Sequence, residues 1–73
     1  MKLISAQEMV KKFGIQYHTL NYYTAIGLLP ISKKNGNQRM YEEGLVKNRL
    51  QEIFRLSQEG YPLNLIRKKL VGI

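Results

Sequence analysis

Three absences limit what this chain can do. It contains no cysteine, and all five of its acidic residues are glutamates. Without cysteine the chain forms no disulfide and carries out no thiol chemistry, which fits a cytoplasmic protein. With one histidine and no cysteine, we expect no metal site and no cofactor. The most apolar stretch, residues 25–31, is broken by Gly27 and Pro30, so no segment can cross a bilayer or act as a signal peptide, and we expect no membrane partner.

Length and charge indicate a small basic domain. The 73 residues are enough for one domain, residues 1–73, with one small core, and too few for an enzyme cleft carried on a scaffold. The net charge is +7, and it is uneven, because residues 1–41 hold six basic residues and one acidic residue, Glu8. A positive field of this size attracts polyanions, meaning nucleic acid or an anionic membrane surface.

The first helix is predicted from its two ends. Ser5 and Glu8 have the spacing of a capping box, in which each side chain satisfies a backbone N–H of the other residue. Ile4 before the cap and Met9 at the fourth helical position form a hydrophobic staple. Gly14 then ends the helix, because glycine readily adopts the left-handed conformation that follows a helix terminus.

A second helix, at about residues 16–26, is predicted to carry a polar reading face. Its apolar side is formed by Thr19, Leu20 and Tyr23. The outward side has aromatic and hydrogen-bonding residues and no carboxylate: Tyr17, His18, Asn21, Tyr22 and Ala25. Two short helices joined through a glycine, the second with such a face, describe a helix-turn-helix whose second helix enters the major groove of DNA.

A hairpin follows at residues 31–41, and we call it the wing. Asn35-Gly36 predicts a type I′ turn. This turn would pair Lys34 with Asn37, Lys33 with Gln38, Ser32 with Arg39 and Ile31 with Met40. One face would then turn Ile31 and Met40 toward the core, and the other would carry Ser32, Lys34 and Arg39 as a basic ribbon for the phosphate backbone.

The remaining residues predict two further helices. In the first, residues 43–58, the apolar residues recur at helical spacing: Leu45, Val46, Leu50, Ile53 and Phe54. After Gly60, Pro62 opens the last helix, with Leu65, Ile66 and Leu70 facing the core. The fold class is therefore mainly α with a small β-hairpin, a winged helix-turn-helix of four helices and one two-stranded wing.

Several segments together resemble a known family. They are Ile4-Ser5-Ala6-Gln7-Glu8-Met9-Val10, Gly14-Ile15, Thr19-Leu20, Tyr22-Tyr23, Ile26-Gly27-Leu28-Leu29-Pro30 and Arg39-Met40-Tyr41. The chain resembles the N-terminal DNA-binding domain of the MerR family of bacterial transcription regulators. The resemblance implies a recognition helix in the major groove, a wing on the flanking backbone, and a homodimer formed through a C-terminal segment beyond Ile73. It also implies roles for the tyrosine pair and for Arg39 and Tyr41 of the wing.

The chain departs from the family pattern at three positions of the second helix. His18 and Asn21 stand where the family commonly has arginine, and Thr24 stands where glutamate commonly follows the tyrosines. Losing two arginines removes long guanine readers, so we expect a different preferred sequence. Asn21 could instead pair with N6 and N7 of adenine.

These observations give one leading hypothesis and two alternatives. The leading function is sequence-specific binding of double-stranded DNA in bacterial transcription regulation, at the nucleoid. A small excisionase-like or phage-packaging DNA-bending factor is a close variant, and an adaptor for an acidic protein partner is an alternative of another class. An enzyme is not expected, because the one histidine has no aspartate or cysteine partner. The expected DNA-binding residues are Tyr17, His18, Asn21, Tyr22, Lys33, Lys34, Arg39 and Tyr41.

Overall fold

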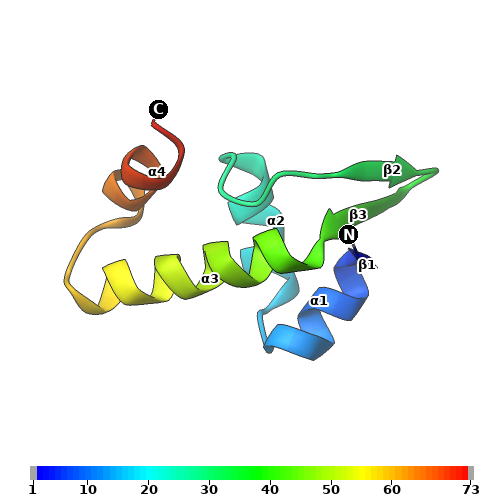
Figure 1. Ribbon diagram of the computed structural model, residues 1–73, viewed down its shortest axis with the longest axis horizontal. Helices are drawn as coiled ribbons and strands as arrows, with labels where there is room; N and C mark the ends of the chain where they lie inside the picture. Colours follow the sequence, from blue (N-terminus) through cyan, green and yellow to red (C-terminus); the bar gives the residue numbers. More distant parts are fainter. Residues whose placement is uncertain (1, 73) are drawn as a thin grey trace.

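Four helices and a small antiparallel sheet make up the fold of residues 2–72, the part that the structure, a computed structural model, describes (Figure 1). The β2–β3 hairpin, which is the wing, projects from one end of the molecule, and α4 lies at the other end. This arrangement confirms the predicted winged helix-turn-helix. The elements in chain order are β1 (Leu3–Ser5), α1 (Ala6–Phe13), α2 (Tyr17–Ala25), β2 (Lys33–Asn35), β3 (Gln38–Glu42), α3 (Glu43–Gln58) and α4 (Leu63–Val71).

The predicted ends of α1 are confirmed. The hydroxyl of Ser5 accepts a hydrogen bond from the Glu8 backbone N–H at 3.2 Å, and the Ser5 N–H donates to the Glu8 carboxylate at 2.9 Å. At the other end Gly14 has a φ of 67° and donates its N–H to the carbonyl of Val10. The left-handed glycine turns the chain sharply, so that α2 starts only three residues after α1 ends, at Tyr17.

The capping box predicts a pH dependence of stability. The Ser5 backbone N–H, by donating to the carboxylate, holds the pKa of Glu8 below its ordinary value. A lowered pKa in the folded state means that the ionised form adds stability above about pH 4.3, and that this stability is lost as the pH falls through the folded pKa. Glu8→Gln keeps an oxygen that can accept from Ser5 but does not titrate.

We therefore expect the wild type to exceed Glu8→Gln in free energy of unfolding at pH 7, with the difference shrinking as the pH falls from about 5 toward 3. Urea unfolding followed by circular dichroism at each pH measures both proteins. Other titrating groups are common to the two proteins and cancel in the comparison. A difference that is the same at pH 7 and pH 3 would contradict this account of the cap.

The sheet has three strands, in the order β1-β3-β2, where the sequence predicted only a two-stranded wing. In the added pairing, Ile4 of β1 lies opposite Tyr41 of β3, and both side chains are buried. A strand of three residues is too short to show the alternating pattern by which strands are recognised, so Ile4 could be interpreted only as part of the α1 cap. Strand β1 fixes the base of the wing against the start of α1.

The predicted turn of the wing is wrong by one residue, and Lys33 and Lys34 therefore each pair two residues further along β3 than predicted. The structure pairs Asn35 with Gln38 and Lys34 with Arg39, so the two central turn residues are Gly36 and Asn37. Gly36 has a φ of 65°, and no non-glycine residue in the described range has a positive φ. A type I′ turn at Asn35-Gly36 would need positive φ at both residues, whereas a turn of type II′ needs it only at its first, a glycine.

The predicted inward face of the wing is also wrong. Tyr41 is fully buried, and because side chains alternate along a strand, Met40 points to the opposite face of the sheet. Ile31 is 40% exposed rather than turned to the core. The burial of Tyr41 therefore places Arg39 and Tyr41, and not Met40, on the side of β3 that faces α2.

Two clusters of buried side chains form the core, and Tyr23 and Leu50 pack against both. The first joins β1, α1, α2, β3 and α3, and the second joins α3 to α4. Their buried members are Ile4, Ala6, Met9, Leu20, Leu29, Tyr41 and Val46 in the first, and Leu28, Ile53, Leu56 and Ile66 in the second.

Three residues predicted to face the core are exposed. Leu45, Phe54 and Leu65 expose 38%, 67% and 42% of their surface. At 3.6 residues per turn, Leu45 and Phe54 lie roughly 80–100° to either side of Val46 around α3, at the edges of the stripe that the other helices cover. Helical spacing alone does not give the width of that stripe.

Candidate nucleic-acid interface

The wing is joined to α2 through Arg39. Its Nη2 donates a hydrogen bond to Oδ1 of Asn21 on α2. Its guanidinium carbon also lies 5.9 Å from the centre of the Tyr17 ring and 5.8 Å from that of Tyr41. Both distances fall within the roughly 6 Å over which a cation is attracted to an aromatic face. Arg39 thus holds the wing and the N-terminal half of α2 in one fixed relation.

All four residues of α2 expected to contact DNA are exposed. Tyr17 and Tyr22 expose 50% and 55% of their surface, and His18 and Asn21 are exposed beside them. Since residues four apart are neighbours on a helix, Tyr17 adjoins Asn21 and His18 adjoins Tyr22. Leu20 is fully buried on the other side and fixes the rotation of the helix. The helix therefore presents an uncharged face of rings and hydrogen-bonding groups.

The two wing lysines lie on different faces of the hairpin. Lys34 pairs with Arg39 and Lys33 pairs with Met40, and paired residues of an antiparallel ladder share a face. Lys34 thus belongs to the face that carries Arg39, and Lys33 to the opposite face. Both lysines are exposed. The structure therefore places Lys34 beside Arg39 on one face of the hairpin and Lys33 on the other face.

The expected contact of Tyr41 with DNA is corrected by its burial. Its side chain is 0% exposed, and its hydroxyl lies 2.8 Å from Oγ1 of Thr24. Thr24 donates its single hydroxyl proton to the carbonyl of Leu20 at 2.8 Å, so Tyr41 is the donor in the pair with Thr24. A buried ring whose hydroxyl bonds to α2 cannot reach DNA. Tyr41 instead holds β3 against the recognition helix.

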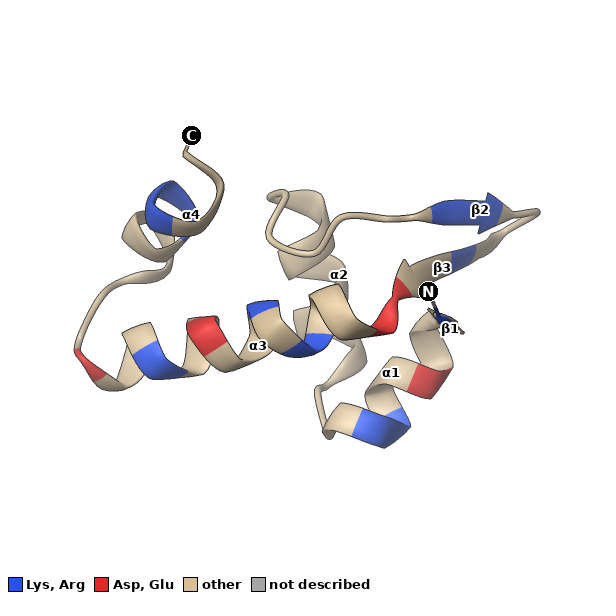
Figure 2. Ribbon diagram, in the orientation of Figure 1, with Lys and Arg blue, Asp and Glu red and all other residues tan. Residues whose placement is uncertain are grey.

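The basic residues of the wing are free of acidic partners within residues 2–72. The ion pairs of the structure lie elsewhere, between Glu43 and the lysines of the N-terminal region and between Arg55 and its neighbours on α3. Figure 2 shows the basic positions of β2 and β3 at the end of the wing, with the acidic positions on α1, at the end of β3 and on α3. The positive charge of the wing is therefore not neutralised by an acidic residue in this range.

A small notch between α1, α2 and the wing contains residues that the sequence did not single out. Its volume is about 270 Å³, and none of its lining residues is acidic. Gln7, which is exposed in the first turn of α1, is the clearest of these residues. In the sequence it stood out only as a member of the capping-box segment. The lining residues are Ala6, Gln7, Tyr17, Asn37, Gln38 and Arg39.

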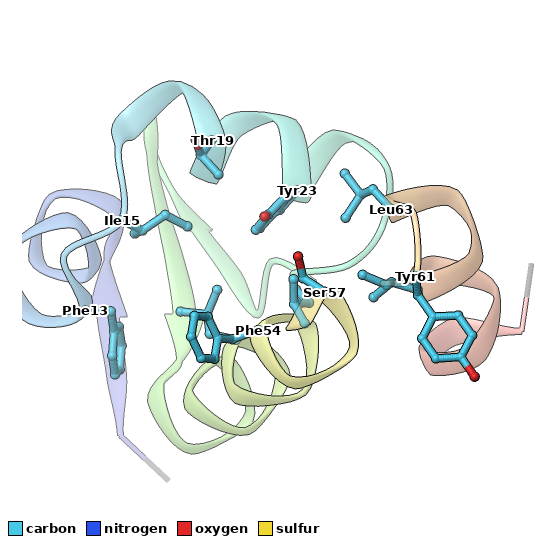
Figure 3. Close-up of a pocket in the computed structure, with 11 residues that line it drawn as sticks. Phe13, Ile15, Thr19, Tyr23, Phe54, Ser57, Tyr61 and Leu63 are labelled. Atoms are coloured by element: carbon cyan, nitrogen blue, oxygen red, sulfur yellow. The ribbon is translucent and has the colours of Figure 1, made fainter. Parts of the chain in front are cut away.

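A second hollow, of about 450 Å³, opens between the α1–α2 pair and the α3–α4 pair (Figure 3). Its lining residues are mainly apolar, and those that carry a hydroxyl are Thr19, Tyr23, Ser57 and Tyr61. None of its lining residues is an acid, a histidine, a lysine or an arginine. It offers neither the charge for a nucleic acid nor the paired titratable groups for acid–base catalysis.

Residues 2–72 contain no candidate membrane-spanning helix and no candidate cluster of metal ligands. No helix there is long and apolar enough to cross a membrane. No three residues among histidine, cysteine, aspartate and glutamate lie together in that range as candidate metal ligands.

Comparison with known proteins agrees with the geometry. Residues 4–72 match the family model described as MerR HTH family regulatory protein. The chain is 36% identical over 67 residues to the mercuric resistance operon regulatory protein of Bacillus cereus, covering 90% of this chain and 49% of that protein. It is 35% identical over 66 residues to nodulation protein NolA of Bradyrhizobium elkanii, covering 89% of this chain and 30% of that protein. No solved structure gives a match.

Fold and surface together define a winged helix-turn-helix protein of the DNA-binding kind. The match to the family model covers nearly the whole chain, and the chain belongs to the MerR family. Proteins of this family are DNA-binding transcription regulators and not enzymes. The chain spans less than half the length of each of the two relatives.

Proposed function

We propose that this chain binds double-stranded DNA sequence-specifically, as the DNA-binding part of a bacterial transcription regulator. Helix α2 lies in the major groove and the wing lies on the flanking phosphate backbone. The observation that carries the proposal is the joint between them, because the Arg39–Asn21 hydrogen bond places a carboxylate-free helix face and a basic hairpin side by side. A groove-reading element beside a phosphate-binding element is the arrangement that sequence-specific DNA binding requires.

The exposed residues divide into two roles. His18 and Asn21 contact base edges, since they are exposed on the reading face of α2 and carry hydrogen-bonding groups. Tyr22 contacts the backbone through its hydroxyl, and Lys33 and Lys34 bind phosphates. Tyr17 lines the space between helix and wing and supports Arg39 there.

The regulator acts in the cytoplasm on nucleoid DNA as a homodimer, with dimer contacts made by a segment outside these residues. Its family relatives are longer than this chain and include a protein named as an operon regulator. A dimer of this class would bind two half-sites related by two-fold symmetry. Membership of a regulator family favours this function over the DNA-bending factor and the adaptor for an acidic protein.

Selection of bound sites from a pool of randomised duplexes tests the proposal. We expect enrichment of a defined motif, as one half-site for a monomeric chain or as an inverted repeat for a dimer. His18→Ala should change the base preference at one position of the motif and leave the others unchanged. A folded chain that binds no duplex at low salt, or that enriches no motif, would overturn the assignment.

A further inference from the structure

The hydrogen bond between Arg39 and Asn21 fixes which atoms of Asn21 point outward. A guanidinium carries only donors, so the atom of Asn21 that meets it must be the amide oxygen. The nitrogen of that amide, with its two N–H groups, is then the atom left for another partner. The chain sets this orientation itself, before any DNA is bound.

Two aromatic rings hold the arginine in this place. Tyr17 and Tyr41 lie on α2 and β3, and both ring centres are within 6 Å of the guanidinium carbon. Tyr41 is itself fixed by burial and by its hydrogen bond to Thr24. Arg39 is also half-buried, unlike the lysines of the wing. Its guanidinium is therefore held against α2 and is not extended toward a phosphate.

From these contacts we propose that Asn21 is the specificity residue for guanine, and that Arg39 is a positioning residue which sets this preference; the inference rests on the proposed function. Guanine presents two acceptors, N7 and O6, in the major groove, whereas adenine presents the acceptor N7 beside the N6 amino donor. The adenine amino group would meet an amide oxygen already engaged by a cation, with further guanidinium donors beside it. Guanine O6 meets donors only, and the nearby positive charge favours it.

The proposal changes the interpretation of both residues. Asn21 in isolation would be expected to pair with adenine, because a free amide offers one donor and one acceptor. Arg39 on a basic hairpin would be expected to bind phosphate and to contribute equally on every sequence. Joined, they act as one group in which N–H donors outnumber the one acceptor site left on the amide oxygen.

Site selection with four proteins tests the pair: the wild type, Asn21→Ala, Arg39→Ala and the double variant. We expect the wild type to prefer guanine at one motif position by roughly 5- to 100-fold over adenine, the range for a bidentate base contact. Asn21→Ala should lose that preference, and Arg39→Ala should exchange it for a preference for adenine at the same position, because the freed amide again offers one donor and one acceptor. The double variant should match Asn21→Ala, because Arg39 acts on this preference only through Asn21.

Arg39→Lys serves as the conservative variant, since lysine keeps the charge and N–H donors but not the planar fork. It should retain part of the guanine preference. A purely electrostatic role of Arg39 would predict that lysine retains all of this preference, and a purely structural role would predict that it retains none. Thermal unfolding of each variant confirms that the folded fraction is not what changes.

Two results would overturn the inference and leave the proposed function standing. One is an Arg39→Ala protein that binds more weakly on all duplexes with its base preferences unchanged. The other is a wild type that prefers adenine at the position which Asn21→Ala alters. Absence of duplex binding by a folded wild type at low salt would instead refute the proposed function itself, and the inference with it.

Discussion

Tyr41→Ala is expected to destabilise the domain by about 3–5 kcal/mol, the range for removing a buried aromatic side chain. For 73 residues the whole free energy of unfolding is about 4–11 kcal/mol at the usual 0.05–0.15 kcal/mol per residue. At the lower end of that range the loss is large enough to leave a substantial unfolded fraction. Tyr41 belongs to the first core cluster and also connects β3 to α2, so both its volume and its hydroxyl contribute.

Tyr41→Phe separates these two contributions. It keeps the ring against Arg39 and removes only the hydrogen bond to Thr24, at a cost of about 0.5–1.5 kcal/mol. Urea unfolding followed by circular dichroism measures both variants. Because the hydroxyl points into the protein, folded Tyr41→Phe should bind duplex DNA with the affinity of the wild type. If the folded phenylalanine variant binds DNA much more weakly, the hydroxyl has a role at the interface and the structural account of Tyr41 is wrong.

Local signals in the sequence predicted the helices well. The capping box of Ser5 and Glu8 and the left-handed Gly14 are each determined by a few neighbouring residues, and α1 has the predicted ends. Helix α3 covers residues 43–58 as predicted, because its 16 residues give the apolar spacing several turns in which to show. Where the contacts that determine a helix join residues within about four positions of each other, the sequence pattern is sufficient to predict it.

The errors concern contacts between distant residues. Strand β1 pairs Ile4 with Tyr41, and no local pattern contains that partner. The one-residue error in the wing followed from choosing the commoner Asn-Gly turn, although the chain closes with Gly36 in the first central position. That error moves each cross-strand partner by two residues and leaves the same residues together on each face. The inward side of the wing was misassigned because Tyr41 is buried by residues far from it in the sequence.

The candidate site likewise has one feature that local sequence signals predicted and one that depends on a contact between distant residues. The exposed face of α2 was predictable from helical periodicity, and its four residues are exposed in the structure. The bond between Arg39 and Asn21 joins residues 18 positions apart, and each residue in isolation suggested an independent contact with DNA. The sequence singled out both residues but not their relation, which depends on how the wing folds back on α2.

Removing both wing lysines is expected to change the salt dependence of DNA binding as well as its strength. Each phosphate contact of a basic side chain contributes about 0.9 to the slope of log affinity against log salt, because counterions are released. Lys33→Ala combined with Lys34→Ala should therefore reduce that slope by about 2, and should weaken binding equally on all sequences. Fluorescence anisotropy of a labelled duplex, titrated between about 50 and 200 mM salt, measures the slope directly.

The tandem lysines of α4 provide the matched control. Lys68→Ala combined with Lys69→Ala removes the same charge from exposed positions at the end of the molecule away from the wing (Figure 2). If the wing binds phosphates, the control keeps the slope of the wild type, because loss of net charge alone removes no phosphate contact. Equal changes of the slope in the two double variants would mean that DNA binding depends only on the net positive charge of the chain. The wing would then have no specific place on the DNA backbone.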